Sequence, residues 1–331
     1  MIITRVPFRI SFAGGGTDLP SFYLNEDGRV INATIDKYIY VAVKRQTAIA
    51  EYKYRINWSK IEFKNNIDDI EHPIAREALK MMEIDFPLEI STFADIPAKT
   101  GLGSSSAFAI GLLHSLYALN GQMVTKGSLA AKAASLEIDI LGRKIGKQDH
   151  YSAAYGNINV FDFYKSGQVS IDPVLYRPET KSAVENRLML FYTAITRDSN
   201  DILKIQSEKN SINQKILSEM KEQVNLIREI FSTGKNLQEI GYILDQGWKL
   251  KKKLVDTISS SEIDQYYENA IKAGAIGGKL LGAGGGGFLM FYVEPENQKS
   301  VRRSLSDLYE LPFQFDTGGG TRITYYDQER V

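Results

Sequence analysis

Three short segments of the sequence combine glycines with side chains that bind anions or hydroxyl groups. The first segment runs from Arg9 to Asp18 and contains three consecutive glycines. Glycines let the backbone come close to a ligand, while an arginine, a threonine and an aspartate supply a fixed cation and oxygen atoms. These residues favour a sugar pocket, and a glycine-rich turn in which Asp18 caps a helix is the alternative. The ligand-binding candidates of this segment are Gly15, Gly16, Thr17 and Asp18.

The second segment places two glycines and three serines where an apolar helix is expected to begin. Unpaired main-chain N–H groups at a helix start, the positive end of the helix dipole and hydroxyl groups together favour a phosphate, and a serine hydroxyl also binds Mg²⁺. Simple N-capping by Ser104 is the alternative, but it needs only one serine. The predicted phosphate-binding loop consists of Gly101, Leu102, Gly103, Ser104, Ser105 and Ser106.

The third segment, from Gly277 to Gly287, has five glycines in its last six residues. Its letters satisfy the dinucleotide pattern GxGxxG, which is a weak indication by itself. That pattern requires a strand before it and a helix after it, whereas we expect a helix before it and a strand at 288–293 after it. A Walker A motif is also missing from the sequence. The alternative, a tight helix-to-strand turn, needs one or two glycines and does not account for five.

Hydrophobic periodicity predicts how strands and helices position these segments. Runs of alternating or β-branched residues predict strands within 1–65 and at 88–93, 157–195, 287–293 and 322–326. Apolar spacings of three and four predict helices at 69–84, 104–120, 126–141, within 198–273 and at 295–309. The mixture indicates an α+β fold in two halves with a boundary near 180–197. We therefore expect an N-terminal domain at 1–185 and a C-terminal domain at 186–331.

The composition of the 331-residue chain excludes several classes of function. Its 40 Lys and Arg balance 40 Asp and Glu, so it lacks the basic excess that nucleic acids or anionic membranes demand. No stretch approaches the ~18 apolar residues that span a bilayer. The absence of Cys removes disulfides and sulfur-bound metals, and three scattered His suggest no metal cage. With no secretory signal at its start, the chain is expected to be cytoplasmic, without nucleic-acid or membrane partners.

Together the three segments, in this order and at these separations, resemble the motifs of the GHMP kinases. The resemblance covers nearly the whole chain, and its most specific element is Pro97 with Gly101–Ser106, which is similar to the family's ATP-phosphate loop. Residues 9–18 and 146–151 look most like those of the heptose 7-phosphate kinases. These enzymes phosphorylate the anomeric hydroxyl of D-glycero-D-manno-heptose 7-phosphate and make the 1,7-bisphosphate used for nucleotide-activated heptose.

The resemblance implies a fold, cofactors and residue roles. It implies an N-terminal domain like a ribosomal-protein domain, a ferredoxin-like C-terminal domain, and ATP and Mg²⁺ bound between them. Asp149 would be the catalytic base, and Arg9 would lie near the accepting hydroxyl and keep Asp149 ionised. Asp18 would hold sugar hydroxyls. The metal ligands would be Glu137 and Ser104 or Ser105, and the third-motif glycines expected at the substrate are Gly284 and Gly285.

The sequence leaves the substrate and its contacts open. A sugar phosphate needs a cation for its remote phosphate, and for each candidate a solvated surface charge is the competing interpretation: Lys99, Arg143, Lys147 and Arg197. His150 departs from the Gln common in the family and receives no role. The alternatives are a GHMP kinase for L-fucose or a hexose, an NAD-dependent oxidoreductase using Gly282–Gly287, and a non-catalytic nucleotide-binding module. The partner expected is a sugar phosphate, and the chain is expected to be a monomer or a homodimer.

Overall fold

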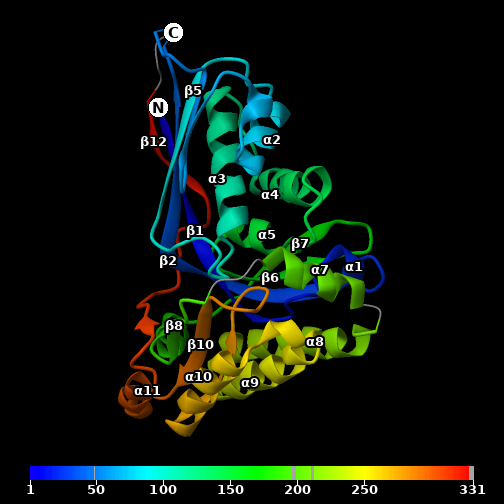
Figure 1. Ribbon diagram of the computed structural model, residues 1–331. Helices are drawn as coiled ribbons and strands as arrows, with labels where there is room; N and C mark the ends of the chain where they lie inside the picture. Colours follow the sequence, from blue (N-terminus) through cyan, green and yellow to red (C-terminus); the bar gives the residue numbers. More distant parts are fainter. Residues whose placement is uncertain (48, 196–198, 210–211, 328–331) are drawn as a thin grey trace.

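The computed structural model describes residues 1–47, 49–195, 199–209 and 212–327, which form two β-sheets with helices packed against them (Figure 1). The first sheet has eight strands. In sheet order they are β12 (Arg322–Tyr326), β1 (Ile2–Ala13), β2 (Gly28–Arg45), β5 (Leu88–Ala94), β3 (Tyr54–Asn57) and β4 (Ile61–Lys64), with β6 (Ile158–Phe163) and β7 (Val169–Pro173) added from β2. All neighbours are antiparallel except β3 and β5.

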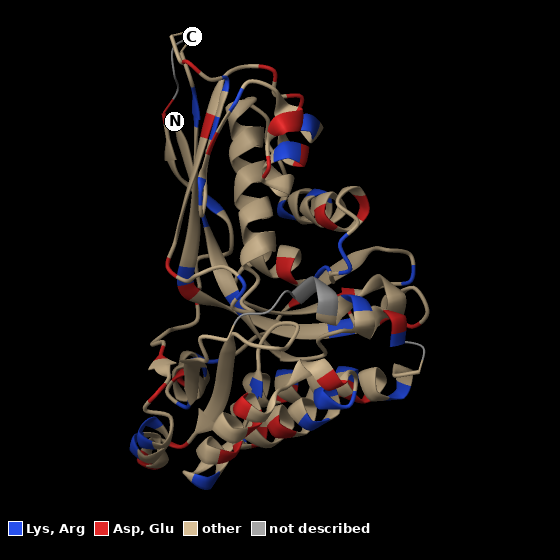
Figure 2. Ribbon diagram, viewed as in Figure 1, with Lys and Arg blue, Asp and Glu red and all other residues tan. Residues whose placement is uncertain are grey.

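Strands β1 and β2 are buried on both faces over much of their length, because helices of both halves pack against them. The central helix, α3 (Ser104–Leu119), has no Lys, Arg, Asp or Glu and lies against β1 and β2 (Figure 2). The helices of this half are α1 (Pro20–Tyr23), α2 (Pro73–Met81), α3 (Ser104–Leu119), α4 (Lys126–Ser135), α5 (Gln148–Tyr155) and α6 (Pro178–Glu185). Helix α4 continues into a π-helical turn, Leu136–Ile140.

The second sheet has the strand order of a ferredoxin-like domain. Its members are β8 (Leu188–Tyr192), β9 (Ala275–Leu280), β10 (Phe288–Val293) and β11 (Tyr309–Glu310), and they lie in the order β11-β8-β10-β9. The helices of this half are α7 (Ser199–Lys209), α8 (Gln214–Thr233), α9 (Glu239–Lys252), α10 (Ser261–Lys272) and α11 (Gln298–Ser304). The α+β class and the two-part architecture expected from the sequence are confirmed.

One expectation, a helix directly before the third glycine-rich segment, is wrong. Helix α10 ends at Lys272, and strand β9 occupies Ala275–Leu280 before the turn. Gly277 allows this strand to pack closely on helix α9. A Cβ on Gly277 would lie 2.0 Å from the carbonyl oxygen of Gly241 in α9, so only glycine lets α9 approach β9 this closely. The dinucleotide pattern still fails, because strand β10 and not a helix follows the turn.

The two halves are not separated at one point of the chain. The last strand, β12, returns to pair with β1, and Ile35 and Phe315 form an isolated bridge. The larger apolar core also runs from β1 and β2 into α8, where the rings of Phe12 and Phe231 meet edge to face at 5.5 Å. The division at 185 and 186 remains a prediction. None of the helices in the described part of the chain combines the length and the apolar composition that a bilayer span requires.

Candidate active site

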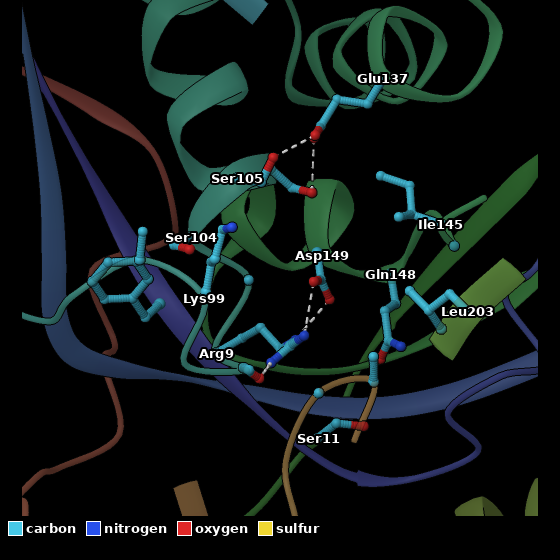
Figure 3. A pocket seen from close by; sticks show the side chains of 18 of the residues that line it. Arg9, Ser11, Lys99, Ser104, Ser105, Glu137, Ile145, Gln148, Asp149 and Leu203 are labelled. Atoms are coloured by element: carbon cyan, nitrogen blue, oxygen red, sulfur yellow. Dashed lines mark hydrogen bonds and ion pairs between the residues drawn. The ribbon is translucent and has the colours of Figure 1, made fainter. Parts of the chain in front are cut away.

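A cavity of about 990 Å³ brings all three glycine-rich segments together. Its walls come from β1, the turn before α3, the start of α5, the end of α9 and the turn between β9 and β10. In the close view, Arg9 and Asp149 lie between Ser105 and Glu137 on one side and Ser11 on the other (Figure 3). Residues more than 100 positions apart therefore face one space.

Arg9 and Asp149 form a two-pronged ion pair inside this cavity. Nε and Nη2 of Arg9 donate to Oδ1 and Oδ2 of Asp149, each at 2.7 Å, and Nη1 donates to the carbonyl oxygen of Gly101 at 2.6 Å. This planar geometry is specific to arginine. Asp149 is the second residue of α5, so its negative charge also lies near the positive end of that helix dipole. The pair expected from the resemblance is thus brought together, with Asp149 partly exposed.

The glycine- and serine-rich turn leads into α3 without a side-chain cap. Gly103 is the N-cap in the left-handed region, at φ 83°, and a Cβ there would lie 3.2 Å from Oδ2 of Asp149. The first N–H groups of a helix have no partner within it, so this turn offers donors for an anion next to Asp149. Ser104, Ser105 and Ser106 line the cavity. Leu102 is buried in the core, and its carbonyl accepts from the Arg9 N–H at 3.2 Å.

The third segment packs its backbone directly on the second. A Cβ on Gly282 would lie 2.5 Å from Cα of Gly101, and one on Gly287 would lie 2.3 Å from the carbonyl oxygen of Thr100. Both glycines have positive φ, at 73° and 104°. The glycines therefore let two loops cross without side chains between them. Gly284 lines the cavity, whereas Gly285 is buried behind it and donates to the carbonyl oxygen of Ile258.

Glu137 is completely buried in the π-helical turn, a local form that often occurs at functional sites. Its carboxylate accepts hydrogen bonds from the hydroxyls of Ser105 at 2.5 Å and Ser106 at 3.0 Å, from Arg143, and lies 2.9 Å from Nε2 of His150. Burial raises the pKa of Glu137, but the bonds to His150 and Ser105 and the charge of Arg143 outweigh it and hold the pKa at about 2. Glu137 is thus an anion beside the serine turn.

Asp18 lines the cavity wall next to Gln148. It accepts from the main-chain N–H groups of Gly16 and Gln148, both at 3.1 Å, and from the Gln148 side chain at 3.2 Å. A Cβ on Gly146 would lie 1.8 Å from the Asp18 carboxylate, so only glycine fits at position 146. Burial, then the charge of Asp149, raises the pKa of Asp18 to about 6. Gly15 and Gly16 also line the cavity; Thr17 does not, because its hydroxyl bonds the carbonyl oxygen of Gly14 within the turn.

The structure separates the four cations considered for a remote phosphate. Arg143 bonds Ser105 and Glu137, beside the serine turn. Lys147 donates to the carbonyl oxygen of Gly167 and is absent from the cavity wall described here. Lys99 lines the cavity near Ser104 (Figure 3). Arg197 lies outside the described residues.

Sequence reasoning missed several residues that line or support the site. His150 was given no role but contacts Glu137. Two buried lysines, Lys251 and Lys279, line the cavity, and only Lys279 lies within one of the three glycine-rich segments. An apolar end of the cavity contains Trp58, His72 and Phe108, whose rings meet with centroids 4.7 Å apart. Burial lowers the pKa of His72 to about 4, so the His72 ring is neutral near pH 7.

A helix start that offers N–H groups and hydroxyls, facing an arginine–aspartate pair across one cavity, is the arrangement expected of a phosphotransferase. The chain matches the family models for the GHMP kinases N terminal domain at residues 73–157 and the GHMP kinases C terminal domain at 223–311. It therefore belongs to the GHMP kinase family, and within that family it is an ATP-dependent sugar kinase.

Individual relatives point in the same direction. The chain is 31% identical over 323 residues to the D-glycero-alpha-D-manno-heptose 7-phosphate kinase of Campylobacter jejuni, covering 92% of this chain and 93% of that one. It is 26% identical to the L-fucokinase/L-fucose-1-P guanylyltransferase of Bacteroides fragilis, with coverage of 92% and 36%. A solved D-glycero-D-manno-heptose 1-phosphate kinase from Bacteroides thetaiotaomicron superposes with a TM-score of 0.80 at 23% identity, covering 99% and 100%.

Proposed function

We propose that the chain transfers the γ-phosphate of ATP to the anomeric hydroxyl of D-glycero-D-manno-heptose 7-phosphate and forms heptose 1,7-bisphosphate. The observation that carries the proposal is the ion pair between Arg9 and Asp149, which lies in the cavity directly beside the serine turn. The heptose substrate is taken from the two heptose kinases to which the chain is similar.

In the proposed reaction, the anomeric oxygen bonds to the γ-phosphorus while the bond from that phosphorus to the β–γ bridging oxygen breaks. ADP leaves, and the hydroxyl proton passes to the carboxylate of Asp149. Because the transition state for phosphoryl transfer is loose, the protein acts mainly by alignment and charge stabilisation. Arg9 fixes the orientation of Asp149 through two bonds of 2.7 Å and places a cation where charge develops on the transferred group.

The nucleotide is expected to lie along the cavity from its apolar end to the serine turn. Trp58 and Phe108 offer aromatic contacts for a base, and the N–H groups at the start of α3 face its phosphates. On the other side of Asp149, Asp18 and Gln148 offer polar groups for the hydroxyls of a sugar. In this arrangement the acceptor hydroxyl of the sugar lies beside Asp149 and faces the phosphates of the nucleotide.

The oxygen donors around the serine turn fit Mg²⁺, which prefers carboxylate and hydroxyl oxygens. Glu137 is ionised there, and Ser105 bonds the same carboxylate; Ser104 and Ser105 are adjacent at the start of α3. When bound, Mg²⁺ would neutralise charge on the phosphates of ATP. Arg143 contacts the same oxygen of Glu137 and would have to turn toward the phosphates to make room.

A coupled ADP-release assay with Mg²⁺ tests this function. The panel contains heptose 7-phosphate, heptose 1-phosphate, the unphosphorylated heptose, L-fucose, galactose and mannose, each with ATP. A separate series replaces ATP by NAD and measures the formation of NADH. The proposal predicts the highest kcat/KM for heptose 7-phosphate and a product phosphorylated at the anomeric position. A preference for L-fucose or a hexose would contradict the heptose assignment, and ATP binding without turnover on any sugar would indicate a binding module.

A further inference from the structure

Two lysines line the cavity and are almost completely buried. Lys251, near the end of α9, is 8% exposed, and Lys279, in β9, is 7% exposed. Nζ of Lys279 donates to the carbonyl oxygen of Phe12 at 3.1 Å, and Nζ of Lys251 donates to those of Leu280 at 3.3 Å and Gly282 at 2.5 Å. Within the described part of the chain, neither ammonium group contacts a carboxylate. Each keeps at least one N–H unused, because an ammonium has three.

The surroundings of these lysines add positive charge. Burial, followed by the charge of Arg9, lowers the pKa of Lys279 to about 7. Burial lowers the pKa of Lys251 well below its usual value, and the charges of Lys279 and Arg9 lower it further. Arg9 is already paired with Asp149. Such a group of buried cations is costly unless an anion joins it, and a bound anion would favour the protonated form of both lysines.

Ser11 gives a second, independent indication of a missing ligand. Its hydroxyl is buried and lines the cavity, and it has no hydrogen-bond partner among the residues that the structure describes. Ser11 follows Arg9 by two positions on β1, so the two side chains share a face of the strand. In Figure 3 it lies beyond Arg9, away from Ser105 and Glu137. A buried hydroxyl without a partner is uncommon, and a ligand oxygen would satisfy it.

We propose that Lys251, Lys279 and Ser11 form a subsite for the remote phosphate of a phosphorylated sugar. The inference rests on the proposed function and adds to it the groups that distinguish a sugar phosphate from a free sugar. Two ammonium groups and one hydroxyl match the several oxygens of a phosphate dianion. Ser11 lies on the opposite side of Arg9 from Ser105 (Figure 3), and Lys279 bonds the carbonyl oxygen of Phe12, the next residue of β1. A ligand that presents its acceptor hydroxyl to Asp149 would therefore reach Ser11 and the lysines with its phosphate.

The test compares two substrates that differ only in that phosphate. We would measure kcat/KM for heptose 7-phosphate and for unphosphorylated heptose with Lys279→Gln and Lys251→Gln, since Gln keeps an N–H donor and loses the charge. We expect kcat/KM for the phosphorylated sugar to fall by about tenfold to a hundredfold, as for lost charge-assisted bonds, with little change for the free sugar or in the KM of ATP. Lys249→Gln is the control, because Lys249 lies on the same helix with its side chain 66% exposed.

The outcomes separate this subsite from other roles. Equal losses with both sugars would overturn it, since the lysines would then only support the main chain; so would a loss confined to the KM of ATP. If the wild-type protein phosphorylates neither heptose, the proposed function fails, and inorganic phosphate becomes the probe. A rise in Tm with phosphate that the double Lys251→Gln, Lys279→Gln variant lacks would still support the subsite, and the same rise in both proteins would overturn it.

Discussion

At the scale of single residues, the carboxylate of Asp149 is the group on which the proposed chemistry depends. Both of its oxygens are oriented by Arg9. Asp149→Asn keeps the shape of the side chain and removes the proton acceptor, so we expect turnover to fall at least about a hundredfold while ATP binding is largely kept. Initial rates and ATP titration would measure both. Near-normal turnover would mean that another group accepts the proton or that none is needed.

His150 is expected to act through Glu137 as a positioning residue. It is completely buried, and its Nε2 lies 2.9 Å from the carboxylate, whereas its Nδ1 has no partner among the described residues. His150→Phe removes the bond, so we expect a higher half-saturating Mg²⁺ concentration and a loss of about tenfold in kcat/KM. His150→Gln restores an N–H donor and should recover most of the lost kcat/KM. Equal Mg²⁺ dependence in all three proteins would contradict this role.

Asp18 should make stability depend on pH. Because its pKa rises to about 6 on folding, the native state keeps a proton there that the unfolded chain has lost between about pH 4 and pH 6. The free energy of unfolding therefore falls as pH rises through that window, by about 3 kcal/mol from this group. Asp18→Asn should remove this part of the fall, measured as the difference between variant and wild type in urea at pH 4 and pH 7. The exposed Asp307→Asn is the control, and a constant difference for Asp18→Asn would refute the assignment.

At the scale of elements, the crossing of the second and third segments explains why glycines recur in both. Gly282 and Gly121 have similar left-handed conformations, at φ 73° and 68°, but a Cβ meets backbone only at Gly282. Gly121→Ala should therefore cost about 1 kcal/mol of stability and leave kcat unchanged. Gly282→Ala should also move the turn before α3, with a loss of kcat/KM on the order of a hundredfold. We would measure kcat/KM and Tm for both variants. Equal losses of kcat/KM in the two variants would argue against a contact between the second and third segments.

At the scale of the whole molecule, the larger of two apolar cores joins the two sheets. Phe12 from β1 packs on Phe231 from α8, and a Cβ on Gly14 would lie 2.9 Å from Val224. We expect calorimetry to show one transition with equal calorimetric and van't Hoff enthalpies. A fragment of residues 1–185 should expose this apolar face and bind a hydrophobic dye. Two resolved transitions would support two independent domains instead.

Residue types and their spacing predicted most of the helices and strands and the chemical groups of the site. Arg9, Asp18, Glu137, Asp149 and the serine turn all line the cavity. Arg9, Asp18 and the serine turn belong to short glycine-rich segments, which dictate local backbone geometry, whereas Glu137 and Asp149 were expected from the resemblance alone. By themselves, the residue types of the whole set specify a cation, two kinds of carboxylate and donors for an anion.

Which groups meet across the cavity depends on how the helices and sheets pack together. The Thr17 hydroxyl donates to the carbonyl oxygen of Gly14 in its own turn. The Glu137 carboxylate accepts from Ser105 and Ser106 and also contacts His150. Lys251 lies in a run of lysines that looks like a solvated helix end, yet it is buried against the third segment. Such placements follow from how helices pack on sheets between residues far apart in the chain, and local spacing carries no information about contacts at that distance.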